Sequence, residues 1–586
     1  MSAPPSYLEF ERAIKRMKPG KAPGPDNIPL EFYTRCGPEI KNNLMMLILK
    51  IWETKTIPQD FKDVNIVTIF KKGDREDCNN YRGISLLSTA GKIFARILLD
   101  RLLELAEEVL PESQCGFRPS RGTIDMVFCA RQLQEKSLEQ QQPAMFIFWD
   151  LKKAFDKVPR LALWAVLARF GCPPDFVSLI RALHDGMFGR VLHQGALSDP
   201  FSINGGLRQG CPLAPVGFSL YVAALINEIP PEMPAIDLRF RMDGGAFNLK
   251  RLKARARTSN TLIRELQYAD DSATPCQSAE DLQRTANAYN SAYERFGMQV
   301  NTDKTKTLIQ HPPGRVIPNT DTSIGNQHLE EVNQFSYLGS ILTPSATCKK
   351  EVESRIRAAY AAFGRLTPRV FNNHALTRET KIMVFQAVVM STLLYASETW
   401  TLYKSDLRSL ERFQQQKLRQ ILGIRWESHT TNNEVLRRAS AKSVEACIAQ
   451  HRLRWAGHIL RMEDTRLPKI MLFGELANES RPRGRPKLRY KDQLKSTLNA
   501  AGIGHETWEE TARDRTAWRR AVRDGATTIE RNRIQKEEER RRERRERMRQ
   551  PPPQPTIPCP HCRRFFCHRL GLASHIKYKH PQIGGD

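Results

Sequence analysis

Three acidic residues in this sequence have the types and setting of a two-metal centre. Asp270 and Asp271 are adjacent and follow Tyr268 and an alanine, and far upstream Asp150 ends the apolar run Met145–Trp149. Carboxylates held together at the ends of buried strands repel one another and resist ionisation unless a cation pairs with them. Two magnesium ions roughly 3.5–4 Å apart could activate a hydroxyl and stabilise a leaving pyrophosphate. A solvent-exposed acidic turn is the alternative for an isolated Asp-Asp pair.

A glycine-rich segment lies between these acidic groups, from Asn204 to Pro215. Its glycines free the backbone, and the apolar stretch Phe218–Leu225 that follows is readable as a helix. A nucleotide could therefore lie against this backbone, around Gln209 and Gly210.

In this order, the three segments resemble the reverse transcriptase of LINE-type, non-LTR retrotransposons. The resemblance extends over nine ordered blocks and more than half of the chain. The blocks are Lys18–Asp26, Val67–Asp74, Asn80–Leu86, Gln114–Thr123, Asp150–Asp156, Asn204–Pro215, Tyr268–Asp271, Gly297–Thr305 and Phe335–Gly339. The resemblance implies that Asp150 and Asp270 bind two Mg²⁺ ions and that Asp271 completes the acidic cluster. It also implies that Lys304 protonates the leaving pyrophosphate, a general-acid role that depends on placement.

The resemblance further implies a nucleotide site. Phe155 stands where the family has a ring that collides with a ribose 2′-hydroxyl and so favours deoxynucleotides; ordinary core packing is the alternative. Lys71 and Arg82 would reach the triphosphate, where a guanidinium can clamp phosphate. Either could instead be a solvated surface charge, since a basic protein has many of them. Gln209 and Gly210 belong to the same site.

A few positions depart from the family pattern, although none of them is one of the three carboxylates. Gly83 replaces a usual proline, Ala214 a usual serine, and Gln267 an apolar residue. The family commonly carries an endonuclease before the polymerase. Because this sequence begins at the first polymerase block, DNA nicking cannot be assigned to it from these residues.

The composition agrees with a nucleic-acid partner. The 586 residues include 91 Lys and Arg against 64 Asp and Glu, a net charge of +27, which favours a polyanion. A membrane surface is the alternative, but no apolar run reaches the roughly 18–20 residues of a spanning helix, and the N-terminus lacks a secretory pattern. Nine of the twelve cysteines are scattered from Cys36 to Cys447, which suits a reducing compartment. We therefore expect a soluble intracellular protein.

The expected fold class is α+β, a right-hand polymerase with fingers, palm and thumb, followed by a helical post-thumb region and a small ββα zinc finger. Apolar spacing predicts a helix over 92–110, and amphipathic helices over 351–366 and 381–394 indicate a helical thumb. We expect six regions. They are an N-terminal extension of the fingers (1–55), fingers and palm (56–343), thumb and post-thumb (344–470), a basic post-thumb segment (471–525), a charged helix with a proline-rich spacer (526–556) and the zinc finger (557–580).

The region after the thumb contains basic segments. Arg452–Arg461 and Arg481–Pro486 resemble blocks found after the polymerase in LINE proteins. The second has the core of a minor-groove AT-hook, although a loop that contacts phosphates is the preferred interpretation. Glu530–Arg549 has Glu and Arg four residues apart, which predicts a solvated helix, and Pro551–Pro555 would extend it as a spacer.

The last segment has the ligand spacing of a two-Cys two-His zinc finger. Its four predicted ligands to one structural Zn²⁺ are Cys559, Cys562, His575 and His580. Phe566 and Leu572 occupy the two core positions, and so small a unit could not hold a core without metal. Cys567 and His561 are interpreted as bystanders.

The zinc finger is expected to grip the backbone of a nucleic acid instead of reading its sequence. In the ordinary register the base-reading positions are His568, Gly571 and Ser574, of which the last two offer little side chain for paired hydrogen bonds. Charge comes instead from Arg563, Arg564, Lys577 and Lys579.

Together these features predict an RNA-directed DNA polymerase that extends a DNA 3′-hydroxyl on an RNA template, primed from a nicked target. Its expected partners are template RNA, target or primer DNA and deoxynucleoside triphosphates, with no membrane. The expected site of action is the nucleus, after a cytoplasmic ribonucleoprotein stage. A viral RNA polymerase is one alternative, opposed by Phe155. The other is a decayed or domesticated element product that binds nucleic acid without polymerising, opposed by the intact Asp150, Asp270 and Asp271.

Overall fold

The computed structural model describes residues 1–586 except 72, 255, 319, 478–486, 550–553 and 581–586. A palm sheet lies at the centre, with strand order β14-β11-β3-β10-β9. Its strands are β3 (Ala144–Trp149), β9 (Leu266–Tyr268), β10 (Asp271–Cys276), β11 (Lys306–Gln310) and β14 (Glu330–Glu331). Strand β3 pairs antiparallel with both β10 and β11. It is therefore an interior strand.

Strand β3 is apolar throughout because both faces of the palm sheet are covered. Phe146 and Phe148 belong to a core with helix α6 (Thr123–Glu139), whereas Met145, Ile147 and Trp149 belong to a second core with helix α10 (Ala279–Arg295). Every residue of the strand is buried. A continuous apolar run is typical of a strand packed on both sides.

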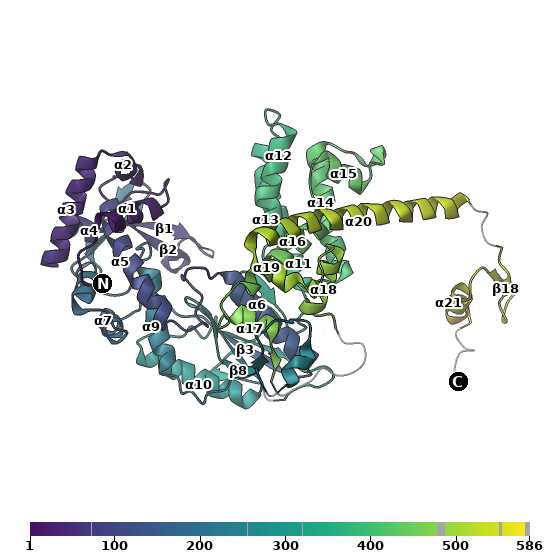
Figure 1. Cartoon of the computed structure of the whole chain (residues 1–586), viewed down its shortest axis with the longest axis horizontal. Helices are drawn as coiled ribbons and strands as arrows, with labels where there is room; N and C mark the ends of the chain where they lie inside the picture. Colours follow the sequence, from purple (N-terminus) through teal and green to yellow (C-terminus); the bar gives the residue numbers. More distant parts are fainter. Residues whose placement is uncertain (72, 255, 319, 478–486, 550–553, 581–586) are drawn as a thin grey trace.

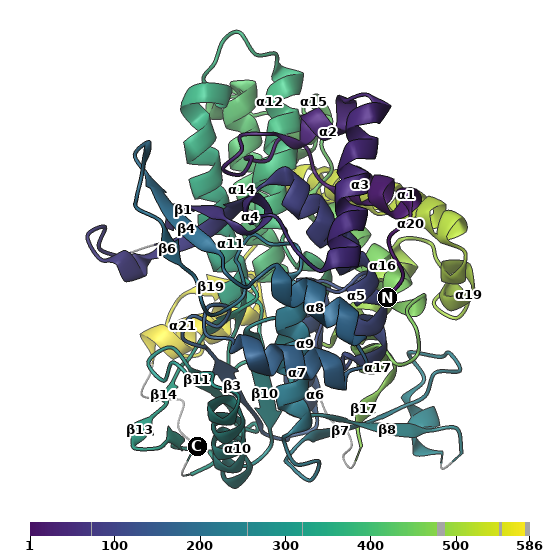
Figure 2. The ribbon, with the colours of Figure 1, turned by 90° about the vertical axis from the view of Figure 1, so that its left-hand side faces the viewer.

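A second sheet, the finger sheet, lies apart from the palm sheet in Figure 2. Its strands are β1 (Val64–Phe70), β2 (Tyr81–Leu87), β4 (Phe188–His193), β5 (Ala196–Leu197) and β6 (Phe201–Ser202). The helices around it and below it are α1 (Tyr7–Arg16), α2 (Leu30–Arg35), α3 (Pro38–Thr54), α4 (Gln59–Lys62), α5 (Thr89–Val109), α7 (Arg160–Arg169), α8 (Pro174–Ala182) and α9 (Ala214–Asn227). The helix predicted over 92–110 coincides with most of α5, and the one predicted over 218–225 lies within α9.

A helical region with its own apolar core follows the palm and stands opposite the fingers in Figure 1. It comprises α11 (Lys349–Leu366), α12 (Arg378–Val384), α13 (Ser391–Leu393), α14 (Lys404–Leu422), α15 (Asn432–Arg438) and α16 (Val444–Leu460). The helix predicted over 351–366 lies within α11. The one predicted over 381–394 is not a regular α-helix, because a π-helical stretch, Phe385–Met390, separates α12 from α13.

The chain then returns to the palm. Strand β17 (Glu475–Leu476) pairs with β7 (Ile236–Phe240), which also pairs with β8 (Ser259–Ile263). The helices here are α17 (Leu467–Phe473), α18 (Tyr490–Ala500), α19 (Trp508–Arg513) and α20 (Arg515–Arg549). Helix α20 is longer than the predicted charged helix, and it begins inside the region expected to end at residue 525. Its first half buries Trp518, Val522 and Ile529 in the α6 core.

The basic block Arg452–Arg461 covers the second half of helix α16 and the residue after it, and it is largely packed. Arg452 is buried and donates hydrogen bonds to Trp400 O (3.1 Å), Gln493 Oε1 (2.7 Å) and Thr497 Oγ1 (2.9 Å). Trp518 donates to Leu453 O at 3.0 Å, and a Cβ on Gly457 would lie 2.0 Å from Trp518 Nε1. Glycine at this position therefore lets α16 and α20 pack closely.

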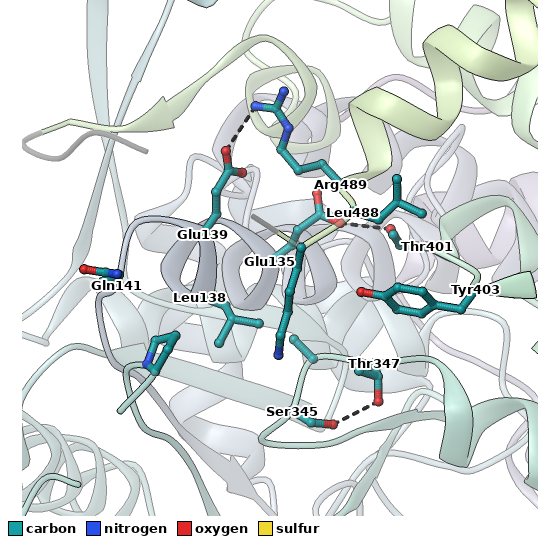
Figure 3. A pocket seen from close by; sticks show the side chains of 13 residues that line it. Glu135, Leu138, Glu139, Gln141, Ser345, Thr347, Thr401, Tyr403, Leu488 and Arg489 are labelled. Atoms are coloured by element: carbon teal, nitrogen blue, oxygen red, sulfur yellow. Dashed lines mark hydrogen bonds and ion pairs between the residues drawn. The ribbon is translucent and has the colours of Figure 1, made fainter. Parts of the chain in front are cut away.

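A cavity of about 310 Å³ marks the junction between α6 and these later segments (Figure 3). Inside it, Glu135 accepts hydrogen bonds from Thr401 Oγ1 (2.9 Å) and from the backbone N–H of Tyr490 (3.0 Å), and Arg489 pairs with Glu139 at 3.1 Å. Acidic side chains of α6 thus hold segments from both the helical region and the post-thumb region.

The chain's last folded unit lies beyond the end of α20 in Figure 1. It consists of β18 (Ile557–Pro558), β19 (Phe565–Phe566) and α21 (Arg569–Lys579), the ββα order that was predicted. Across the described part of the chain, we find no helix with both the length and the apolar character needed to cross a membrane.

Candidate active site

Strand pairing brings the three predicted carboxylates to one end of the palm sheet. Asp150 directly follows β3, and the register of β10 places Ser272 opposite Trp149, so Asp271 lies next to Asp150 across the two strands. Asp270 sits in the tight turn between β9 and β10, beside Ala269, whose φ of +60° is in the left-handed region. The turn therefore presents Asp270 and Asp271 together.

These carboxylates destabilise one another's charged form. Loss of hydration, followed by the charges of Asp270 and Asp150, raises the pKa of Asp271 to about 6, although its side chain reaches solvent. Loss of hydration and the charge of Asp150 also raise the pKa of Asp270, while the nearby Arg82 opposes the rise. The arrangement favours uptake of a cation, which fits a divalent metal held by oxygen ligands.

Asp150 has further partners from the block Gly297–Thr305. Asn301 Nδ2 donates a hydrogen bond to Asp150 Oδ2 at 3.0 Å. The backbone N–H of Asp150 donates to Thr305 Oγ1 at 3.2 Å. Lys304 Nζ lies 3.9 Å from the same Oδ2, and two thirds of the Lys304 side chain is exposed. The structure thus places Lys304 at the carboxylates, with freedom to reach a ligand.

Phe155 lies on the turn after Asp150 and is half-buried. Its ring stacks on Phe218 of α9 with centroids 4.4 Å apart, and its carbonyl accepts the N–H of Leu207 at 2.8 Å. The ring is therefore fixed in place, and part of it remains exposed.

The glycine-rich segment docks against strand β2 of the finger sheet. The N–H of Ser85 donates a hydrogen bond to Gln209 O at 2.8 Å. Gly210 has a φ of +123°, and a Cβ atom at this position would lie only 2.3 Å from Ser85 O. Only glycine permits this close approach. The segment predicted to face a nucleotide thus joins palm and fingers.

The predicted phosphate-binding residues do not share one partner. Loss of hydration raises the pKa of Asp156, and the charges of Lys153 and Lys71 and a hydrogen bond from Gln209 oppose that rise. Arg82 instead acts on Asp270. Asp156 ends one of the sequence blocks but had no predicted role, although Lys71 and Gln209 both act on its carboxyl group.

Sequence reasoning also missed Gln114, which holds the carboxylate turn. Its Oε1 accepts the N–H groups of Ala269 and Gly116, both at 2.9 Å, and a Cβ on Gly116 would lie 2.4 Å from the nitrogen of Ala269. The unusual Gln267 is fully buried and accepts a hydrogen bond from Gln114 Nε2 at 3.3 Å. The block Gln114–Thr123 was recognisable in the sequence, but nothing in it indicates that Gln114 contacts the turn at Ala269.

The C-terminal ligand set comes together as predicted from its spacing. The ligand atoms of Cys559, Cys562, His575 and His580 all lie within 4.8 Å of one another. Cys562 Sγ and His575 Nε2 are 3.2 Å apart. Two thiols and two imidazoles this close fit a tetrahedral zinc shell.

Of the remaining predicted residues, Cys567 and His561 are exposed and stand outside this group. The three predicted base-reading positions, His568, Gly571 and Ser574, are exposed too. The AT-hook-like segment 481–486 and residues 551–553 of the proline-rich spacer fall outside the described residues.

Replacing Gln114 with Ala should weaken divalent-metal binding at the carboxylates. The change leaves the N–H groups of Ala269 and Gly116 unpaired, at about 1–3 kcal/mol each, and so loosens the turn. We expect roughly tenfold weaker Mn²⁺ binding, measured by electron paramagnetic resonance. The matched control is Gln310→Ala, a buried glutamine of β11 that donates to Gln134 O at 2.9 Å, far from the turn. Equal weakening in both variants would rule out a specific role for Gln114.

Comparison with known proteins agrees with this geometry. Residues 69–342 match the family described as reverse transcriptase (RNA-dependent DNA polymerase). The chain is 24% identical over 442 residues to the RNA-directed DNA polymerase from mobile element jockey of Drosophila funebris, covering 74% of this chain and 45% of that protein. It is 25% identical to a probable RNA-directed DNA polymerase from transposon BS of Drosophila melanogaster, covering 77% and 48%.

A third relative is the Pol polyprotein of the type-1 retrotransposable element R2 of Popillia japonica, 24% identical over 72% of this chain and 55% of that protein. A solved apo telomerase from Candida tropicalis, truncated from its C-terminal domain, has a TM-score of 0.32 and 13% identity, over 54% of this chain and 59% of that chain. The chain spans about half the length of the curated relatives. Residues 69–342 thus match the reverse transcriptase family, and the similar proteins named above come from mobile and retrotransposable elements.

Proposed function

We propose that the chain is an RNA-directed DNA polymerase that extends a DNA 3′-hydroxyl on an RNA template. The supporting observation is the meeting of Asp150, Asp270 and Asp271 at one end of the palm sheet, with Arg82 of the finger sheet acting on Asp270. Template RNA, primer or target DNA and deoxynucleoside triphosphates are its proposed partners. We also propose priming from a nicked target in the nucleus, after a cytoplasmic ribonucleoprotein stage.

In this proposal each residue has a defined task. Asp150 and Asp270 hold two Mg²⁺ ions, which supply activation of the primer hydroxyl and charge neutralisation of pyrophosphate. Asp271 adds negative charge beside them. Lys304, 3.9 Å from Asp150, donates a proton to the departing pyrophosphate. Arg82 binds phosphate oxygens of the incoming nucleotide.

The backbone and rings around the carboxylates select and orient the nucleotide. Gln209 and Gly210 present the backbone against which the nucleotide lies, and Lys71 approaches from the finger side near Asp156. Phe155, fixed by its stack on Phe218, blocks the 2′-hydroxyl of a ribonucleotide. Because the rings support each other, the exclusion depends on a surface that cannot easily move.

Substituting Asp270 with Asn tests the proposed activity directly. We expect nearly complete loss of primer extension on an RNA template with Mg²⁺, because the amide removes a charged metal ligand, while template binding remains. Mn²⁺ should support the unmodified chain, since both ions prefer oxygen ligands. The control Asp199→Asn changes the same charge on an exposed finger loop and should extend normally. Extension that persists in Asp270→Asn, or nucleic-acid binding with no extension by the unmodified chain, would contradict the proposal.

Shrinking Phe155 to Val should relax sugar selection. The smaller side chain leaves room for a 2′-hydroxyl, so incorporation of ribonucleotides relative to deoxynucleotides should rise about tenfold or more. Competitive single-nucleotide extension measures the ratio. The comparison variant Phe218→Leu keeps the Phe155 ring but weakens its support, so it should relax discrimination by less than Phe155→Val does. If both variants discriminate like the unmodified chain, Phe155 serves packing alone.

We propose that the C-terminal module is a zinc finger that grips phosphates. Cys562→Ser should unfold this module alone and weaken binding to unrelated DNA and RNA sequences. The log–log salt slope should become shallower by about 0.7–0.9 for every phosphate that the protein no longer neutralises. Extension of a pre-annealed primer should survive. Cys567→Ser, which alters an exposed cysteine outside the ligand group, is the matched control. A loss confined to one sequence would show base reading instead.

A further inference from the structure

An open basic cleft lies between the helical region and the distal half of α20, where α15 stands over α20 in Figure 1. Its volume is about 490 Å³. One wall is the loop 429–431 together with Asn432, the first residue of α15, and the other carries Arg541, Arg544, Arg545 and Met548. None of the residues assigned to the polymerase site or the zinc finger lines this cleft.

The arginines of the cleft form one stripe of the helix. Positions 541, 544, 545 and 548 follow the spacing of a single helical face. Arg542 and Arg547, on other faces, lie 3.9 Å and 3.5 Å from Glu546 and Glu543. By contrast, Arg541, Arg544 and Arg545 make no ion pair with any described residue. Three adjacent guanidinium groups without counter-charges attract an anion, and their repeated spacing suits a chain of phosphates.

Both walls of the cleft are held in place by contacts outside it. Arg419 Nη2 donates to Thr430 O at 2.8 Å and to Asn432 Oδ1 at 2.9 Å, which fixes the loop. Helix α20 is fixed by its buried first half and by Glu530, which accepts the N–H of Ser443 at 3.4 Å. The cleft therefore exists before any ligand binds, which lowers the ordering cost of binding.

An exposed aromatic ring adjoins the loop wall of the cleft, where the N–H of His429 donates to Trp426 O at 3.2 Å. Trp426 precedes the cleft loop by three residues and is 80% exposed, although tryptophan is normally well buried. A positively charged groove combined with exposed aromatic rings is the arrangement by which proteins hold single strands, whose bases stack on the rings. Thr430, Thr431 and Asn432 line this same wall. Thr431 Oγ1 already accepts the N–H of Glu434 at 3.2 Å, and Asn432 Oδ1 accepts from Arg419 at 2.9 Å, so their remaining donor groups are the ones that could bind a ribose 2′-hydroxyl.

We propose that this cleft binds single-stranded RNA, with phosphates on the arginine stripe of α20 and a base stacked on Trp426. The site is separate from the proposed polymerase reaction, and it assigns a binding role to a helix whose charge pattern alone predicted a spacer.

The test measures binding of an unstructured oligouridylate of about 15 nucleotides to the full chain, without nucleotides or divalent metal, over a range of salt. Failure of polymerisation therefore cannot affect the result.

The first variant changes Arg541, Arg544 and Arg545 to Gln. The control changes Arg540, Arg542 and Arg547 to Gln, which removes the same charge from the same stretch of helix. The slope of log affinity against log salt concentration should become shallower by roughly 2 in the first variant. Each phosphate of a single strand that an arginine neutralises contributes about 0.7 to that slope, and three arginines are removed. The control should keep its slope.

The exposed ring of Trp426 is tested separately. Trp426→Ala should weaken binding of oligouridylate roughly 5- to 100-fold with an unchanged salt slope, and Trp426→Phe should restore most of it. Oligouridylate carrying 4-thiouridine should crosslink to peptides that contain residues 426–432 and 541–548.

Four results would overturn the proposal. The first is an equal loss of RNA binding in the two arginine variants, and the second is crosslinking confined to other peptides. The third is DNA of the same sequence that binds as tightly as the RNA and is weakened by the same variants to the same extent. The fourth is oligoglutamate that binds more tightly than the RNA. The last result would assign the cleft to an acidic protein.

Discussion

The enforced proximity of three carboxylates that have lost part of their hydration is the constraint on which the palm half of this structure depends. Asp150, Asp270 and Asp271 are held together by the pairing of β3 with β10 and by the turn before β10. A flexible frame would let them separate, and the loss of hydration that raises the pKa of Asp271 to about 6 would disappear. The frame is rigid because β3 is buried on both faces and Gln114 holds the turn. The stability of the palm therefore sustains an unfavourable charge arrangement that a cation can relieve.

The sequence predicted the members of this site but not the contacts that position them. Met145–Trp149 is apolar at every position, so a buried strand ending at Asp150 could be expected. The link from Gln114 to Ala269 joins residues 155 positions apart, and no local pattern indicates it. Gln267 was an anomaly in the sequence because a polar residue stood at a core position. Its hydrogen bond with Gln114 supplies the physical reason, since a buried amide needs a partner.

Charge in the later part of the chain was harder to interpret, because a sequence does not distinguish a solvated arginine from a buried one. Arg452 belongs to a basic block, yet it is buried and satisfied by three neighbours. Arg466 is buried against Asp125 at 2.8 Å and joins the post-thumb region to α6. These arginines stabilise tertiary packing and are not accessible to nucleic acid. Arg541, Arg544 and Arg545 come from a segment of lower complexity, yet they face an open cleft.

Helix α20 combines both kinds of charge and so couples two parts of the molecule. Its first half belongs to the core that contains α6 and one face of β3, so the direction of its axis is set by the palm. The twenty residues from Glu530 to Arg549 then extend for roughly 30 Å at about 1.5 Å per residue. The salt bridge between Arg533 and Glu537, at 3.1 Å, stiffens the start of this stretch. A strand bound along its arginine stripe would therefore be held in a fixed relation to the carboxylates, which a flexible linker of the same composition could not provide.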